Sequence, residues 1–145
     1  VCVLETHLDD ANPEWLGALM EQLLQAGALD VGYAALQMKK NRPGVRITVI
    51  APPHLAEPLS RLLLQQSSAI GVRRYLSERR KLRRQSARVA TELGEAAVKL
   101  IYEGERLLRI TPEFDSCRQL AEQSGRPLPE VYRLVERAAE DHFPL

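Results

Sequence analysis

The sequence predicts an α+β fold whose first half has the element order β-α-β-β-α-β, followed by a β-hairpin and two helices. Three observations support this class. Short β-rich apolar runs alternate with two apolar stripes at helical spacing, a Pro-Gly dipeptide separates two of the runs, and the last third contains two further helical patterns. The chain has 145 residues, 45% of them hydrophobic and 27% charged, which describes a globular protein that can bury its own core.

The first strand and the first helix are expected at the start of the chain. Residues 1–8 (VCVLETHL) have the composition of a strand. Asn12 is the predicted N-cap of a helix that has Pro13 at its first position and ends at Gly27. The helix presents an apolar stripe that consists of Leu16, Leu19, Met20, Leu23 and Leu24.

A strand-turn-strand unit follows this helix. Residues 31–38 and 45–51 are β-rich, and Pro43-Gly44 is the predicted turn between them. The exposed tip then carries Lys39, Lys40, Asn41 and Arg42, for which a solubilising loop is the alternative interpretation. A second helix is expected to begin at Pro52-Pro53, and Gly71-Val72 starts a fourth strand.

This order is that of a ferredoxin-like split βαβ sandwich. We expect residues 1–78 to form its core, and residues 79–145 to form an extension that packs on the same domain. Right-handed crossovers join parallel strands in such a sheet. We therefore expect the loop 6–14, the hairpin tip 39–44 and the turn 67–73 to meet at one edge of the sheet.

The extension is predicted as a β-hairpin and a helix pair. Residues 79–102 contain β-rich runs broken at Leu93-Gly94, and residues 113–124 and 129–140 have helical patterns joined across Gly125-Arg126-Pro127. The basic segment 79–88 could face solvent, a neighbouring subunit or a phosphate of a ligand, and the sequence leaves its role open.

The chemistry of the predicted edge suits a polyphosphate bound with a divalent ion. Serine hydroxyls and cationic side chains are groups that bind phosphate, here Ser67, Ser68, Lys39, Lys40, Arg42 and Arg73. Carboxylates are the usual ligands of Mg²⁺ or Mn²⁺, here Glu5, Asp9 and Asp10. Helix capping for the two aspartates and plain turn formation for the two serines are the alternatives. Neither GxxxxGK[ST] nor GxGxxG follows a strand.

Five segments in this order resemble one family: LETHLDDANPE, AGALDV, QMKKNRPG, SSAIGVR and PEFDSCRQLAEQSGRPLPEVY. They are similar to the C-terminal domain of LarC, a family of CTP-dependent nickel-insertion proteins. The resemblance implies an enzyme of lyase or metallochelatase type that metallates pyridinium bisthiocarboxylate mononucleotide and so forms the nickel-pincer nucleotide cofactor of lactate racemase. It also implies a separate N-terminal domain that completes the full-length protein. The family pattern has Asn where this chain has His7 and Met where it has Ala11, and residues 79–107 match it poorly.

The resemblance also implies roles for particular residues. Lys39, Lys40, Asn41 and Arg42 would bind the phosphates of CTP, and Arg73 is a further candidate. A magnesium or manganese ion, or its waters, would be held by Glu5, Thr6, Asp9 and Asp10. The ribose or the base would be reached by Glu113, Asp115 and Arg118, with helix capping as the alternative role of Asp115. Nickel would be the inserted metal, and the resemblance assigns no catalytic residue.

Two other classes of function stay open. One is a non-catalytic oligomerisation or metabolite-sensing domain on the same fold. The other is a helix-turn-helix nucleic-acid module in LAEQSGRPLPEVYRLV, which the acidic Glu130 and Glu136 disfavour, because a recognition helix beside DNA phosphates should be more basic.

Partners and location follow from the same reasoning. We expect a homo-oligomer, for which a trimer and a hexamer are candidates and the symmetry stays open, with nucleotide and pyridinium mononucleotide as ligands and no membrane partner. Cys2 and Cys117 show no metal or disulfide spacing, which favours a reduced cytoplasmic protein. The three histidines, His7, His54 and His142, are dispersed and share no ligand spacing, so the sequence predicts no transition-metal site.

Overall fold

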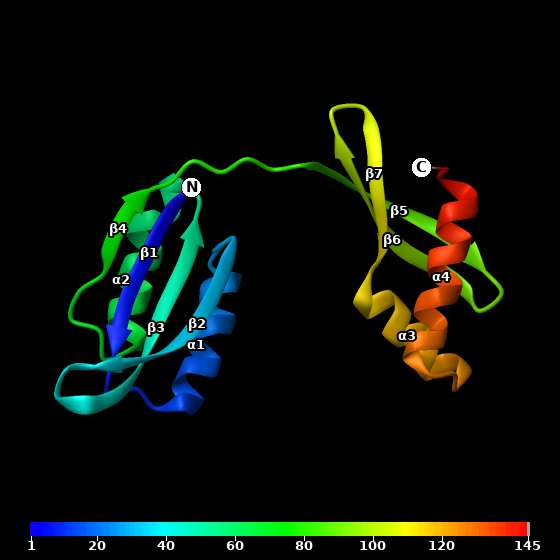
Figure 1. Ribbon diagram of the computed structural model, residues 1–145. Coiled ribbons are helices and arrows are strands. Elements are labelled where there is room, and N and C mark those ends of the chain that lie inside the picture. Colours follow the sequence, from blue (N-terminus) through cyan, green and yellow to red (C-terminus); the bar gives the residue numbers. More distant parts are fainter. Residues whose placement is uncertain (145) are drawn as a thin grey trace. The chain divides into compact units, whose positions relative to one another are not determined.

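The chain divides into two compact units, Val1–Arg79 and Arg80–Leu145, in a computed structural model that describes residues 1–144. Figure 1 shows the helices and strands of each unit, and each unit has a hydrophobic core of its own. The division falls one residue from the boundary that the sequence predicts. The predicted extension is therefore a unit with its own buried residues, and each unit is described separately below.

The N-terminal unit consists of a four-stranded antiparallel sheet and two helices. Its elements are β1 (Cys2–Leu8), α1 (Pro13–Gln25), β2 (Asp30–Met38), the 3-10 turn η1 (Lys39–Asn41), β3 (Arg42–Ala51), the 3-10 turn η2 (Pro53–Leu55), α2 (Ala56–Gln66) and β4 (Arg73–Leu76). The strand order is β2-β3-β1-β4. Both β1 and β2 pair antiparallel with β3, so they run parallel and end at the same edge. The α+β class and the predicted element order are confirmed.

The two faces of this sheet have different roles. Side chains at alternate strand positions point to opposite faces, and one set is buried against α1 and α2, which cover the same face (Figure 1). This core includes Leu4 and Leu8 of β1, Ile47 and Val49 of β3, and leucines of both helices, Leu19, Leu23, Leu59 and Leu63. Glu5 and His7 occupy the alternate positions of β1 and therefore lie on the face away from the helices.

Helix α1 begins as the sequence predicts. The side-chain oxygen of Asn12 accepts a hydrogen bond from the backbone N–H of Glu14 at 2.9 Å, and Pro13 occupies the first helical position. The hydroxyl of Tyr33 on β2 donates a hydrogen bond to the carbonyl of Leu16 at 2.5 Å, which ties the helix to the sheet. Burial raises the pKa of the Tyr33 hydroxyl above its usual 10.0.

The tip of the β2–β3 hairpin differs from the prediction. The chain turns at η1, where Lys40 and Asn41 have φ values of 59° and 57°, and Pro43 and Gly44 already belong to β3. The predicted Pro-Gly turn is wrong because Lys40 and Asn41 take the left-handed conformation, which asparagine tolerates better than most residues. Gly44 has a packing role instead: a Cβ there would lie 2.7 Å from the carbonyl oxygen of Leu8 and would also meet the Met38 sulfur.

The C-terminal unit is a three-stranded antiparallel sheet with two helices. Its elements are β5 (Arg83–Thr91), β6 (Gly94–Glu103), β7 (Arg106–Pro112), α3 (Phe114–Ser124) and α4 (Leu128–His142), and the strand order is β5-β6-β7. The predicted hairpin and both helices are present, whereas β7 was not predicted. The core of this unit contains Val98, Leu100, Cys117, Val131 and Val135. None of the helices in residues 1–144 is long and apolar enough to cross a membrane.

Candidate functional site

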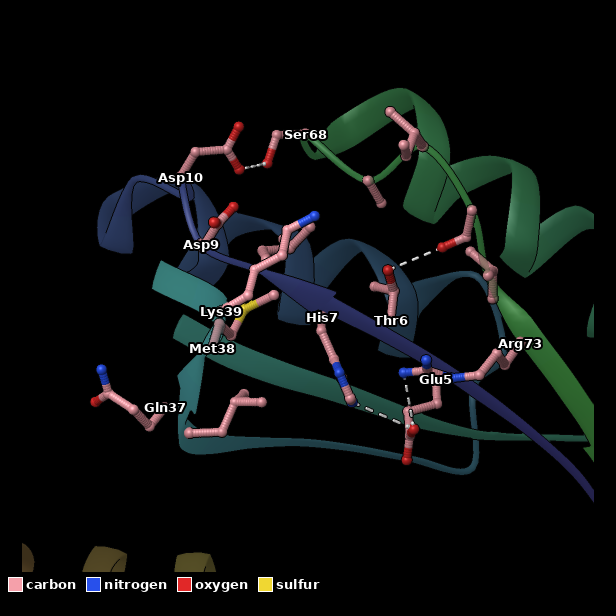
Figure 2. Close-up of a pocket in the computed structure, with 16 residues that line it drawn as sticks. Glu5, Thr6, His7, Asp9, Asp10, Gln37, Met38, Lys39, Ser68 and Arg73 are labelled. Carbon is pink, nitrogen blue, oxygen red and sulfur yellow. Dashed lines mark hydrogen bonds and ion pairs between the residues drawn. The ribbon is translucent and has the colours of Figure 1, made fainter. Parts of the chain in front are cut away.

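An open pocket of about 850 Å³ lies at the edge of the N-terminal sheet where β1 and β2 end and β4 begins (Figure 2). Three stretches line it, namely residues 5–10, 36–39 and 68–73. These stretches lie far apart in the sequence, and they meet at the edge where the topology predicts that they should. All of them belong to the N-terminal unit.

Two ion pairs link the charged side chains of the pocket. The guanidinium of Arg73 lies 3.0 Å from Glu5 Oε1, and the guanidinium of Arg42 lies 3.1 Å from Asp9 Oδ2. About half of each arginine side chain stays exposed, 57% for Arg73 and 54% for Arg42, so solvent weakens both pairs. Either guanidinium can therefore exchange its carboxylate for another anion at a modest cost.

Two side-chain hydrogen bonds fix the turn 67–72 beside the end of β1. The buried hydroxyl of Thr6 donates to the carbonyl of Gly71 at 2.9 Å. The hydroxyl of Ser68 donates to Asp10 Oδ1, as Figure 2 shows. Together they hold the start of β4, and with it Arg73, against the acidic loop.

Lys39 is the cation of the pocket lining that is left without a carboxylate partner among residues 1–144. Its neighbours on the hairpin tip, Lys40, Asn41 and Arg42, do not line the pocket, although Arg42 reaches its rim through Asp9. The structure thus brings Lys39, Ser68 and Arg73 together from the predicted phosphate-binding set, and the pocket has one uncompensated ammonium group to offer an anion.

Ser67 is placed differently from Ser68. Its hydroxyl donates to the carbonyl of Leu63 at 2.6 Å and accepts from the N–H of Ala69 at 3.2 Å. It therefore satisfies backbone groups at the end of α2, which is the turn role left open by the sequence. Ser67 does not line the pocket.

The predicted ribose and base contacts lie in the other unit. Arg118 forms ion pairs along α3 with Asp115 at 3.5 Å and with Glu122 at 3.2 Å. Glu113, which precedes α3 as its N-cap, is paired with Lys99 at 2.7 Å, and Asp115 lies in the first turn. None of these residues lines the pocket at the N-terminal sheet. Their contact with a nucleotide stays a prediction.

Glu5, Asp9 and Asp10 line the same pocket, and each already has a protein partner, which is Arg73, Arg42 or Ser68 respectively. No group of three His, Cys, Asp or Glu side chains within residues 1–144 is arranged to hold a metal ion. A divalent ion at this edge would therefore take part of its oxygen ligands from a bound molecule, as Mg²⁺ does when it is shared with phosphates.

His7 is a lining residue that sequence reasoning left out. Its Nε2 atom is buried and has no hydrogen-bond partner, although it lies 3.4 Å from Glu5 Oε1 (Figure 2). The spacing in the sequence could have indicated His7, because residues two apart on a strand lie on the same face of the sheet. Glu5, two residues before His7, was already a candidate site residue.

The sequence pattern of the family described as nickel insertion protein matches residues 1–132. The chain belongs to the nickel insertion protein family. A family relative from Syntrophotalea carbinolica, whose name refers to nickel insertion, is 60% identical over 143 residues, which are 99% of this chain and 36% of the relative. A similarly named relative from Geobacter metallireducens is 52% identical over 139 residues, 96% of this chain and 36% of that protein. This nickel insertion chain thus spans about a third of the length of these relatives.

Two solved structures are similar to the nickel insertion chain in both sequence and fold. LarC2, described as the C-terminal domain of a cyclometallase involved in the synthesis of the NPN cofactor of lactate racemase, in its apo form, is 37% identical with a TM-score of 0.91 and covers 96% of both chains. Protein MK0293 from Methanopyrus kandleri AV19 is 30% identical with a TM-score of 0.66, covering 96% of this chain and 85% of the other. The resemblance to the C-terminal domain of LarC is confirmed.

Proposed function

We propose that this chain is the CTP- and divalent-metal-binding module of a nickel insertion protein that metallates pyridinium bisthiocarboxylate mononucleotide and so forms the nickel-pincer nucleotide cofactor of lactate racemase. The observation that carries the proposal is the pocket at which Lys39, Ser68 and Arg73 meet Glu5, Asp9 and Asp10. The similarity to LarC2 supports the pathway. The pocket supports the ligand class, because it combines phosphate-binding cations with carboxylates that suit Mg²⁺ or Mn²⁺.

Binding would proceed by exchange of ion-pair partners. Triphosphate oxygens attract Lys39 directly and draw the guanidinium of Arg42 away from Asp9, which is 3.1 Å from it in this structure. The Asp9 carboxylate would then be free to hold the divalent ion, and Glu5 and Asp10 would hold the ion or its waters. The ion would neutralise phosphate charge, while this chain's own residues orient the phosphates and hold the ion against them.

We also assign the N-terminal unit to the ferredoxin-like class. The strand order β2-β3-β1-β4 supports this assignment, because β3 lies between the parallel strands β1 and β2, as a split βαβ arrangement requires.

The enzyme itself would be the full-length protein. Because the chain spans about a third of its relatives, we propose that the remaining two thirds help to bind the pyridinium mononucleotide and that nickel is the cargo of the reaction. A homo-oligomer and a cytoplasmic location stay predictions.

The test is removal of the two tip charges in a Lys39→Gln/Arg42→Gln double variant. Titration calorimetry with CTP, ATP and GTP, each with and without manganese, should show that the unchanged chain prefers CTP with the metal. The double variant should lose at least about 100-fold in affinity, since a charge-assisted hydrogen bond contributes roughly 1.5–3 kcal/mol and two are removed. Circular dichroism should be unchanged, because the side chains of Lys39 and Arg42 are exposed.

A matched control removes two exposed cations elsewhere. Lys81→Gln/Arg84→Gln changes the net charge by the same amount in the C-terminal unit and should leave CTP affinity within about twofold. CTP affinity that is unchanged in the Lys39/Arg42 variant, or that falls equally in both variants, would place the nucleotide elsewhere.

A further inference from the structure

His7 and Glu5 form a donor pair at the floor of the pocket. They are two residues apart on β1, so both side chains lie on the face of the sheet that α1 and α2 leave uncovered. His7 Nε2 lies 3.4 Å from Glu5 Oε1. The pair is within reach of a ligand, because both residues line the pocket (Figure 2).

The spacing of these two atoms is that of neighbouring ligands on one metal ion. Bonds from an imidazole nitrogen and a carboxylate oxygen to a divalent transition metal are roughly 2.1 Å long. Two such bonds whose ends lie 3.4 Å apart subtend an angle of about 108° at the ion, which falls between the octahedral and the tetrahedral value. The separation of the two atoms is therefore compatible with both bonding one ion at ordinary lengths.

The state of both side chains supports the same interpretation. His7 Nε2 is buried with no hydrogen-bond partner, and buried polar atoms in native proteins are nearly always paired. The guanidinium of Arg73 contacts the same Glu5 oxygen, Oε1, at 3.0 Å, and metal-binding carboxylates are characteristically oriented by a hydrogen-bonding partner. One donor atom is thus without a partner, and the other is already oriented.

We propose that His7 and Glu5 are the two protein ligands of a site for Ni²⁺, with water or a bound substrate completing the coordination. Imidazole distinguishes this site from the phosphate-bound ion, because nitrogen ligands favour nickel and similar metals over Mg²⁺ and Mn²⁺. That the ion is nickel rests on the proposed function, whereas the ligand pair rests on geometry alone.

The charges around the pair set the character of the site. Arg73 contacts Glu5, and Arg46 lies opposite His7 in the β1–β3 register. With one carboxylate, one imidazole and the guanidinium of Arg73 at 3.0 Å from that carboxylate, the site is a weak one. Such a site suits an ion that is passed on to a substrate in the pocket better than an ion that is stored.

The experiment titrates Ni²⁺ alone into the 145-residue chain and follows the imidazole signals by NMR. Paramagnetic nickel should broaden the signals of His7 first, while those of His54 and His142 persist to higher nickel concentrations. The His7→Phe variant keeps a ring of similar size without nitrogen donors and should lose about tenfold or more in nickel affinity by calorimetry, since even the loss of an outer partner of a ligand costs 10–100-fold. His54→Phe, at an exposed histidine outside the pocket, is the control and should bind nickel as the unchanged chain does.

A second titration separates this inference from the proposed function. His7→Phe should still bind CTP with manganese, because His7 is not a proposed ligand of the phosphates or of their ion. Nickel binding that is equal in the His7→Phe and His54→Phe variants, or broadening that begins at His54 or His142, would overturn the nickel site whatever the CTP result. Absence of CTP binding in the unchanged chain would count against the proposed function. The nickel titrations of the His7→Phe and His54→Phe variants could still be interpreted.

Discussion

Replacing Gly44 by alanine should destabilise the N-terminal unit, because the added Cβ would clash with the Met38 side chain, which is flexible, and with the Leu8 backbone, which is not. The added Cβ would lie 2.7 Å from the carbonyl oxygen of Leu8, whereas ordinary contacts begin near 3.4 Å, so the strands would have to separate by about 0.7 Å. The β1–β3 ladder has its last pair, Leu8 with Val45, at this point, and neither backbone can move without weakening it. Overpacking of this kind costs roughly 1–3 kcal/mol, partly offset by about 0.5–1 kcal/mol from the lower entropy of the unfolded alanine chain.

The expected net loss is about 1–2 kcal/mol, which corresponds to a fall in Tm of roughly 5–10 °C for a unit of this size. Thermal and urea unfolding can be followed by the fluorescence of Trp15, the single tryptophan of the sequence, which lies in α1 and so reports on the N-terminal unit. Gly32→Ala on β2 is the matched control, because a Cβ there meets nothing within 4 Å and should leave the unit equally stable or slightly more stable. If the Gly44 variant proves as stable as the Gly32 variant, the close approach of Leu8 is not what requires glycine at this position.

Two further predictions concern single interactions of the N-terminal unit. Thr6→Val should lower the free energy of unfolding by about 1–3 kcal/mol, because it leaves the carbonyl of Gly71 without the hydroxyl that donates to it at 2.9 Å. Hydrogen exchange should show faster opening of the turn 67–72. Unchanged exchange in that turn would contradict the prediction. Hydrogen bonds from Arg61 and Arg74 lower the pKa of the Glu57 carboxyl below its usual 4.5. A carboxyl whose pKa is lower in the folded than in the unfolded state stabilises the folded protein at pH values above the unfolded pKa. The contribution of Glu57 is therefore present at neutral pH and is lost as the pH falls below about 4.5. Glu57→Gln should therefore flatten the acid limb of a stability-against-pH curve, and an unaltered limb would count against the assignment.

The fold was predictable wherever a local signal and the topology agreed. Asn12-Pro13 marks the start of α1 because both residues satisfy the needs of a helix start by themselves. The meeting of the three lining stretches followed from strand order alone, since parallel strands joined by right-handed crossovers end at one edge. These inferences needed no knowledge of side-chain packing.

The errors arose where a tertiary contact decided the local structure. Pro43-Gly44 has the composition of a turn, but Gly44 is glycine because Leu8 approaches it, and the turn lies at Lys40 and Asn41 instead. Strand β7 escaped prediction because its alternation is short and is interrupted by arginines. Both features depend on contacts with segments that are distant in sequence, which periodicity does not report.

The same limit applied to the candidate site. Charge and residue type indicated Lys39, Ser68, Arg73 and the acidic loop as neighbours, and the structure gathers them in one pocket. That the buried nitrogen of His7 makes no hydrogen bond could not be known from the sequence, because only the three-dimensional arrangement shows it.

Under the proposed function, the ion pairs of the pocket would also select which anions bind there. Three carboxylates, from Glu5, Asp9 and Asp10, and three cations, from Lys39, Arg42 and Arg73, lie in or beside the pocket, so their charges sum to zero even though only Arg42 and Arg73 are ion-paired with a carboxylate. A small monovalent anion gains little by displacing a carboxylate from its arginine and is left in solution. A polyphosphate without a metal is repelled by the carboxylates of the pocket as much as it is attracted by its cations. A polyphosphate that carries a divalent cation brings a positive partner for the carboxylates that the arginines release. Under the proposed function, the nucleotide would therefore bind together with its divalent ion rather than alone.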